Sequence, residues 1–187
     1  MKKIDLNKLR DIAYKTACEH GLHDQELSNE HCLCLVISEL MKAVEADRKR
    51  KYFKGKIMFE RDFNLYSALV EENVRYRNAF EKHIKDTVGD KLADTVIRLL
   101  DLAGLRNLNL NRFALVNVVS KKKTFTENIH SIVKDITNYK YTLEELVNYA
   151  ITQVFVLSDI LDIDLLWHIE HKMKYNELRE DMYGKKY

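Results

Sequence analysis

The absence of proline is the feature of this 187-residue chain that most restricts its fold. Proline ends or kinks helices, and no such residue interrupts the long runs in which apolar residues recur every three or four positions. This spacing gathers apolar side chains on one face of a helix, whereas the alternation typical of strands is scarce. The runs cover residues 6 to 18, 33 to 46, 63 to 84, 92 to 103, 113 to 119 and 146 to 167.

Glycines and capping residues divide these runs into separate helices. Thr124 with Glu127, and Thr142 with Glu145, have the spacing of a capping box, in which side chains bond the free backbone N–H groups that begin a helix. The glycines fall where the apolar spacing starts, stops or weakens. They are Gly21, Gly55, Gly89, Gly104 and Gly184. We therefore predict an all-α helical bundle with about seven helices, in a single domain of residues 1–187.

The composition is typical of a soluble globular protein. Apolar residues make up 46% of the chain and charged residues 32%, which disfavours a disordered or a membrane protein. No run approaches the roughly eighteen apolar residues of a membrane span, and the opening MKKIDLNKLR lacks the apolar segment of a secretory signal. We therefore expect a cytoplasmic protein with no membrane contact. The net charge of +2 gives no sign of a nucleic-acid partner.

Three cysteines, Cys18, Cys32 and Cys34, are the only candidates for disulfide or thiolate chemistry. Their number is odd, and their spacing does not match a zinc site. We expect all three to be reduced thiols within helices.

Two charged helical stretches carry the candidate functional residues. In SELMKAVEADRKR, residues 38 to 50, Glu39 and Lys42 lie at the margin of the apolar face of a helix. In GDKLADTVIRLLDL, residues 89 to 102, one stripe opposite the apolar face contains Asp90, Lys91, Asp94, Arg98 and Asp101. Periodicity alone favours a solvated surface with pairs such as Asp94 and Arg98. The alternative is a carboxylate site for a cation.

The sequences around these stretches resemble a known family. LVISELMKAVEADRK and IKDTVGDKLADTVIRLLDLAG resemble the two central helices of the MazG-like all-α nucleotide pyrophosphohydrolases, relatives of the dimeric dUTPases. The final DIDLLWHIEHKMKYNELREDMYGKKY is similar to the closing segment of that family. The resemblance covers about residues 6–51, 84–110 and 142–187. It implies a MazG-like fold with 52–83 and 111–141 as helical elaborations, and a homodimer or higher homo-oligomer.

The resemblance also implies a metal site. The family pattern is Glu-x-x-Glu on one helix and Glu-x-x-Asp on a later one, four acids that hold Mg²⁺ while a nucleoside triphosphate is hydrolysed to the monophosphate and pyrophosphate. Glu39 matches the first acid and Asp94 the last, whereas Lys42 and Lys91 stand where glutamates are expected. Asp90, one turn before Asp94, is the best substitute ligand. The candidate metal ligands are thus Glu39, Asp94 and Asp90, and no catalytic residue is assigned.

The two lysines leave three interpretations open. In the first interpretation, Lys42 and Lys91 impair Mg²⁺ binding and pyrophosphohydrolysis, because an ammonium group cannot act as an oxygen ligand. They form crossed salt bridges, Lys42 with Asp94 or Lys91 with Glu39, which preserve the helix geometry without a metal. They contact phosphate directly, which preserves nucleotide binding without the metal. The resemblance favours a nucleoside triphosphate pyrophosphohydrolase with an impaired metal site, and the alternative is a non-catalytic nucleotide-binding or protein-interaction module on the same fold.

A polar stripe near the C-terminus is the candidate substrate-binding surface. His168, Lys172, Asn176 and Arg179 are spaced by four, four and three residues and share one helix face, and Lys185 follows in a glycine-hinged tail. Cations late in a helix also complement the helix dipole. Because the pattern resembles the substrate-binding end of the family, we predict that Lys172, Asn176, Arg179 and Lys185 bind the nucleoside triphosphate. Three aromatic residues are candidates for stacking on a base or for the core: Trp167, Tyr175 and Tyr183.

Overall fold

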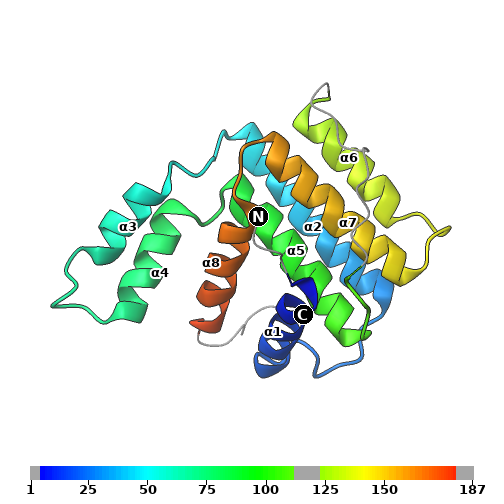
Figure 1. The fold of residues 1–187 in the computed structure, drawn as a ribbon, viewed down its shortest axis with the longest axis horizontal. Coiled ribbons are helices and arrows are strands. Elements are labelled where there is room, and N and C mark those ends of the chain that lie inside the picture. The colour runs from blue at the N-terminus through cyan, green and yellow to red at the C-terminus, as the bar shows by residue number, and fades with distance from the viewer. Residues whose placement is uncertain (1–4, 112–122, 180–187) are drawn as a thin grey trace.

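The computed structural model describes residues 5–111 and 123–179, and these residues form eight α-helices and no strand (Figure 1). The helices are α1 (Leu6–Glu19), α2 (Asn29–Arg48), α3 (Lys56–Asn64), α4 (Glu72–His83), α5 (Val88–Leu105), α6 (Phe125–Ile136), α7 (Leu143–Ile160) and α8 (Leu165–Glu177). The all-α prediction is confirmed, with one helix more than the seven or so predicted. The apolar run 63 to 84 is divided between α3 and α4, and the run 146 to 167 between α7 and α8. The run 113 to 119 lies outside the described residues.

Side-chain caps begin most of the helices. Both predicted capping boxes are present, at Thr124 with Glu127 before α6 and at Thr142 with Glu145 before α7. Four further helices, α1, α2, α5 and α8, begin where a side-chain oxygen accepts a bond from a backbone N–H group of the first turn. These side chains are Asp5, Ser28, Thr87 and Asp164. Helix starts were therefore encoded locally.

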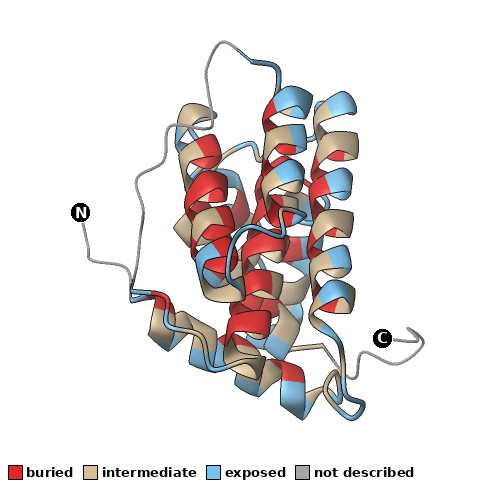
Figure 2. Cartoon of the chain, turned by 90° about the vertical axis from the view of Figure 1, so that its right-hand side faces the viewer, coloured by how far each residue is buried: buried red, intermediate tan, exposed pale blue. Residues whose placement is uncertain are grey.

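Helix α5 lies at the centre of the bundle and packs against α1, α2, α7 and α8 (Figure 1). Its apolar residues Leu92, Val96 and Leu99 are fully buried, as are Val36 and Leu40 on α2. Figure 2 shows buried positions on the facing sides of the helices and exposed positions on their outer sides. The core is thus formed by the apolar helix faces that the spacing predicts.

Two glycines bring the outer helices close to α5. A Cβ atom added at Gly104 would lie 2.4 Å from the Cβ of Tyr14 on α1, and one added at Gly89 would lie 2.5 Å from Nε2 of His168 on α8. Neither glycine has a left-handed backbone, so these positions require a small residue for space rather than for conformation. The two contacts hold α1 and α8 against the same central helix.

Helices α3 and α4 form a hairpin beside the bundle (Figure 1). The hairpin has an apolar cluster of its own, in which Phe59, Tyr76 and Phe80 are buried. Tyr175 of α8 belongs to the same cluster and stacks on Phe80 with ring centroids 4.2 Å apart. The segment 52–83 is therefore helical and is attached to the bundle through α8.

Two further expectations concern membranes and thiols. Within the described ranges no single helix is long and apolar enough to cross a membrane, and α7 and α8 satisfy that requirement only as a pair bent by 115°. All three cysteines are free thiols, as predicted.

Candidate functional site

A cleft of about 340 Å³ lies between α1, α2, α5 and α8. It contains both ends of the predicted metal motif, Glu39 and Asp94, together with the two lysines of the motif. Three of the four predicted substrate-binding residues also line it: Lys172, Asn176 and Arg179. The fold therefore brings together residues that the sequence distributes over three helices. The fourth residue, Lys185, lies outside the described part of the chain.

The polar stripe of α5 faces this cleft instead of bulk solvent. Asp90 is fully buried, and the side chains of Lys91 and Asp94 are only 13% and 18% exposed. The interpretation as a solvated helix surface is therefore wrong, because α1 and α8 pack over the polar side of α5. Glu45, in contrast, pairs with Arg48 and Lys49 on the exposed side of α2.

A cluster of buried ion pairs forms the floor of the cleft. The Lys172 ammonium lies 2.9 Å from Asp90 Oδ1 and 2.9 Å from Asp94 Oδ2, and so connects α8 to α5. The Lys91 ammonium lies 2.8 Å from Asp86 Oδ1, 3.1 Å from Asp90 Oδ2 and 3.8 Å from Asp94 Oδ2. Asp90 Oδ2 also accepts a hydrogen bond from the backbone N–H of Asp86. Both oxygens of Asp90 are therefore occupied.

Glu39 is the acid on the opposite wall. It is 6% exposed, and its Oε1 accepts a 2.8 Å hydrogen bond from Lys42, one turn further along α2. Its Oε2 is buried without a hydrogen-bond partner among the described residues. Burial raises the pKa of Asp94, Lys172 opposes the rise, and the negative charges of Asp90 and Glu39 add to it. Glu39 and Asp94 are thus electrically coupled across the cleft.

The lysines of the floor remain charged despite their burial. Desolvation acts to lower the pKa of Lys91, but Asp90, Asp86 and Asp94 together raise it above its ordinary value. The pKa of Lys172 is raised in the same way, with burial opposed by Asp94 and Asp90. Both ammonium groups are therefore permanent positive charges near neutral pH.

Neither predicted crossed bridge is among the ion pairs of the described residues. Lys42 pairs with Glu39 and Lys91 with the aspartates of α5, so each lysine pairs within or next to its own helix. The bridge between helices is made by Lys172 instead. The ion pairs of Asp94 are with Lys91 and Lys172, in place of the predicted surface pair with Arg98. Sequence spacing does not show which lysine from a distant part of the chain will pack against Asp90 and Asp94.

The carboxylates at this site do not fit a Mg²⁺ ion. The described residues contain no group of three or more His, Cys, Asp and Glu arranged to hold a metal. Each carboxylate that lines the cleft has a basic partner within 2.9 Å: Glu39 with Lys42, Asp86 with Lys91, Asp94 with Lys172 and Asp101 with His23. Mg²⁺ needs oxygen ligands in near-octahedral geometry and is bound through carboxylates that offset its charge. Here the negative charges of Glu39, Asp86 and Asp94 are already offset by lysines.

The described lining of the cleft has more cations than anions. Six cationic side chains stand against four carboxylates. The cations are Lys42, Lys85, Lys91, Arg98, Lys172 and Arg179. The guanidinium groups of Arg98 and Arg179 line the cleft without a hydrogen bond or ion pair within residues 5–111 and 123–179, although the charge of Arg98 acts to lower the pKa of Asp101. These two groups are available to an anionic ligand.

Helix α1 forms a wall that the sequence analysis missed. Ala13, Ala17 and Leu22, together with Thr16 and His20, line the side of the cleft contributed by α1 and the turn after it. Ile97 and Met173 add apolar surface from α5 and α8. Two alanines four residues apart were the available signal, since small side chains let a helix approach closely. The cleft thus has an apolar wall above a charged floor, a combination typical of small-molecule sites.

His168 does not belong to the polar face of α8 that lines the cleft. It is 2% exposed and lies against Gly89 and the ring of Phe53. Burial lowers the pKa of His168 to about 4, so the ring is neutral at pH 7.

Trp167 stacks on His171 with ring centroids 3.8 Å apart, and therefore belongs to the packing between α8 and the hairpin. Tyr183 lies outside the described residues.

Comparison of this chain with models of known protein families, with curated proteins and with solved structures found no match. A proposal for its function therefore starts from the residues of the cleft.

Proposed function

We propose that this chain is a MazG-like nucleotide-binding protein whose cleft takes a nucleoside triphosphate, and whose Mg²⁺-dependent pyrophosphohydrolase activity is impaired or lost. One observation carries this proposal: the cleft combines two guanidinium groups that have no ion pair among the described residues, those of Arg98 and Arg179, with carboxylates that all have basic partners. A cleft of this kind attracts a polyanion and offers little to a divalent cation.

The cations of the cleft have two separate roles in this proposal. Arg98 and Arg179 have guanidinium groups without a partner among the described residues, and they supply charge-assisted hydrogen bonds to phosphate oxygens. Lys91 and Lys172 neutralise Asp90 and Asp94, which would otherwise repel phosphate. The apolar side chains of α1 cover the nucleoside.

Impaired hydrolysis follows from the same ion pairs. The resemblance to the MazG-like class implies four acids around Mg²⁺, and two of these positions carry Lys42 and Lys91. The substitute ligand Asp90 is fully buried and bonded to two lysines. An active pyrophosphohydrolase is the alternative, and its metal would have to displace these lysines.

A nucleotide panel tests the proposal. Ribo- and deoxyribonucleoside triphosphates, dUTP and dCTP included, are titrated calorimetrically and assayed for pyrophosphate release with and without Mg²⁺. We expect binding of at least one nucleotide, with little or no release. Failure to bind any member would refute the proposal. Vigorous Mg²⁺-dependent release would establish the enzyme instead.

Arg179→Ala tests the phosphate contact. The side chain lies at the end of α8, lines the cleft and is not deeply buried. Loss of one charge-assisted hydrogen bond costs about 1.5 to 3 kcal/mol, roughly a tenfold to hundredfold loss of affinity. The melting temperature should stay close to that of the parent. Arg48→Ala, at an exposed position near the end of α2 outside the cleft, is the matched control. Equal nucleotide affinity in the parent and in Arg179→Ala would show that Arg179 does not contact the bound nucleotide.

We also propose, from the resemblance alone, that the chain forms a homodimer or higher homo-oligomer. Light scattering after size-exclusion chromatography measures the mass directly, and a monomer at micromolar concentration would contradict this part of the proposal.

A further inference from the structure

We propose that the cleft binds the metal-free form of a nucleoside triphosphate and that Mg²⁺ weakens this binding, because Lys91 and Lys172 stand as built-in cations beside the acids of the metal motif. This inference rests on the proposed function and adds which ionic form of the nucleotide is recognised.

The positions of the two ammonium groups carry the inference. Lys172 lies 2.9 Å from carboxylate oxygens of both Asp90 and Asp94, and Lys91 lies within 3.8 Å of both. Their side chains are only 8% and 13% exposed, so water screens them poorly. Two positive charges are therefore held at the carboxylates that a metal ion would have to use.

The charges of the whole cluster lead to the same result. Four acids, Glu39, Asp86, Asp90 and Asp94, stand against three lysines, Lys42, Lys91 and Lys172, so most of the negative charge of the metal-motif region is already offset. A Mg²⁺ ion carried in by the nucleotide would lie near the ammonium groups of Lys91 and Lys172, and like charges repel. The metal-free triphosphate carries two more negative charges than its Mg²⁺ complex, and is therefore attracted more strongly by Arg98 and Arg179.

One acceptor in the cleft has no partner, and it does not change this conclusion. Glu39 Oε2 is buried without a hydrogen bond among the described residues. Mg²⁺ beside a triphosphate is normally held by one or two carboxylates together with phosphate oxygens and water, and the other oxygen of Glu39 is already bonded to Lys42. Glu39 Oε2 suits an uncharged hydrogen-bond donor of the ligand, such as a sugar hydroxyl or a base amino group. Because this oxygen is buried, the wall of the cleft must move to admit that donor.

Calorimetric titration in two buffers tests the inference. The parent protein is titrated with dUTP, dCTP, ATP, GTP and inorganic triphosphate, first with a chelator and then with millimolar Mg²⁺ at matched ionic strength. We expect the affinity for the best ligand to fall about tenfold or more when Mg²⁺ is present. Affinity that is unchanged or higher with Mg²⁺ would overturn the inference and leave nucleotide binding standing. Absence of binding in both buffers would overturn the proposed function as well.

The double variant Lys42→Glu with Lys91→Glu tests the cause. It places acids at all four positions of the family pattern, so Mg²⁺ should now strengthen nucleotide binding and raise the melting temperature. Each single substitution should do less. Lys134→Glu, at an exposed position on α6, makes the same charge change away from the cleft and should keep the behaviour of the parent.

A milder variant covers the case in which the double variant does not fold. Lys91→Gln removes the charge without adding an acid, and should reduce the weakening by Mg²⁺ severalfold while the nucleotide still binds. If Lys91→Gln and the double variant both respond to Mg²⁺ as the parent does, the lysines do not determine the ionic form that is bound.

Discussion

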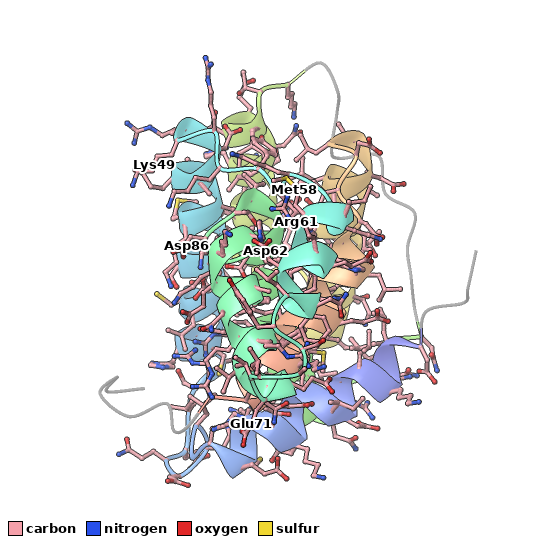
Figure 3. All side chains as sticks on the ribbon, turned by 90° about the vertical axis from the view of Figure 1, so that its left-hand side faces the viewer. Lys49, Met58, Arg61, Asp62, Glu71 and Asp86 are labelled. Carbon is pink, nitrogen blue, oxygen red and sulfur yellow. The ribbon has the colours of Figure 1, made fainter. Side chains whose placement is uncertain are left out.

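Two regions of this molecule surround acidic side chains with cations, and they do so differently. In the α3–α4 hairpin, Asp62 alone pairs with Lys82, His83 and Arg61. Figure 3 labels Asp62 and Arg61, which are neighbours on α3. Lys82 and Arg61 have side chains about two-thirds exposed. In the cleft, four acids share three lysines, and two of those lysines are largely buried beside a cavity.

The two regions differ most in what they do to a carboxylate. Lys82 and His83 hold the pKa of Asp62 well below its usual range, against a smaller opposing effect of burial. Burial raises the pKa of Asp94 in spite of Lys172. The cations of the hairpin therefore stabilise the ionised form of Asp62 and connect α3 to α4. In the cleft cluster, burial instead disfavours the ionised form of Asp94, and this carboxyl group lies beside a cavity. A perturbed pKa beside a cavity is a better indicator of a ligand site than charge alone.

The largest expected difference between the regions is in stability. Asp90→Ala leaves Lys91 and Lys172 without their shared, fully buried partner, so we expect a loss of about 3 to 5 kcal/mol in the free energy of unfolding. Asp62→Ala leaves mostly exposed cations that water can solvate, so its loss should be clearly smaller. Urea denaturation of both variants measures the two losses. Equal losses would show that the cluster beside the cleft is not the more tightly coupled one.

An intermediate effect is expected from His168, which lies between the two regions against Phe53 and Gly89. Its pKa is lowered from 6.5 to about 4, mainly by burial and against the charges of Asp90 and Asp164. A lowered pKa means that the folded state prefers the neutral ring. The stabilisation is therefore present above pH 6.5 and is lost as the pH falls toward 4, by an amount on the order of 3 kcal/mol.

Denaturation midpoints measured across this pH range check the prediction for His168. His168→Gln removes the titrating ring, so the decline in stability between pH 6.5 and 4 should become shallower. Identical profiles for parent and variant would assign acid sensitivity to other groups. Titration of the carboxyl groups by NMR in the same samples should show opposite pKa displacements for Asp62 and Asp94.

The smallest effect should come from the ion pair that ties the hairpin to the bundle. Lys56, the first residue of α3, lies 2.6 Å from Oδ2 of Asp164, which caps α8. Both side chains are about half exposed, so Lys56→Ala should cost no more than about 1 kcal/mol. Hydrogen exchange should become faster in α3 and stay unchanged in α5. Faster exchange in α5 would mean that the hairpin supports the cleft.

Much of the fold was encoded in local sequence. The absence of proline and the spacing of residues such as Leu92, Val96 and Leu99 predicted the helices and their buried faces, because helix geometry repeats every 3.6 residues. The boundaries were harder. The single apolar runs 63 to 84 and 146 to 167 each contain a break, since a turn with apolar residues, such as Leu161 and Ile163, keeps the spacing of a helix.

The sequence by itself determined which charged residues share a helix face, and predicted that Glu39, Asp94 and the two lysines lie close together, as the cleft shows. Only the tertiary structure decided that the stripe of α5 is buried, that Lys172 arrives from α8, and that Asp90 is inaccessible. The reason is physical: helical periodicity describes one helix, whereas the partner of a buried charge is chosen by helix packing. Here two glycines permit that packing, because at Gly104 and Gly89 α1 and α8 come close enough to α5 to enclose its charged face.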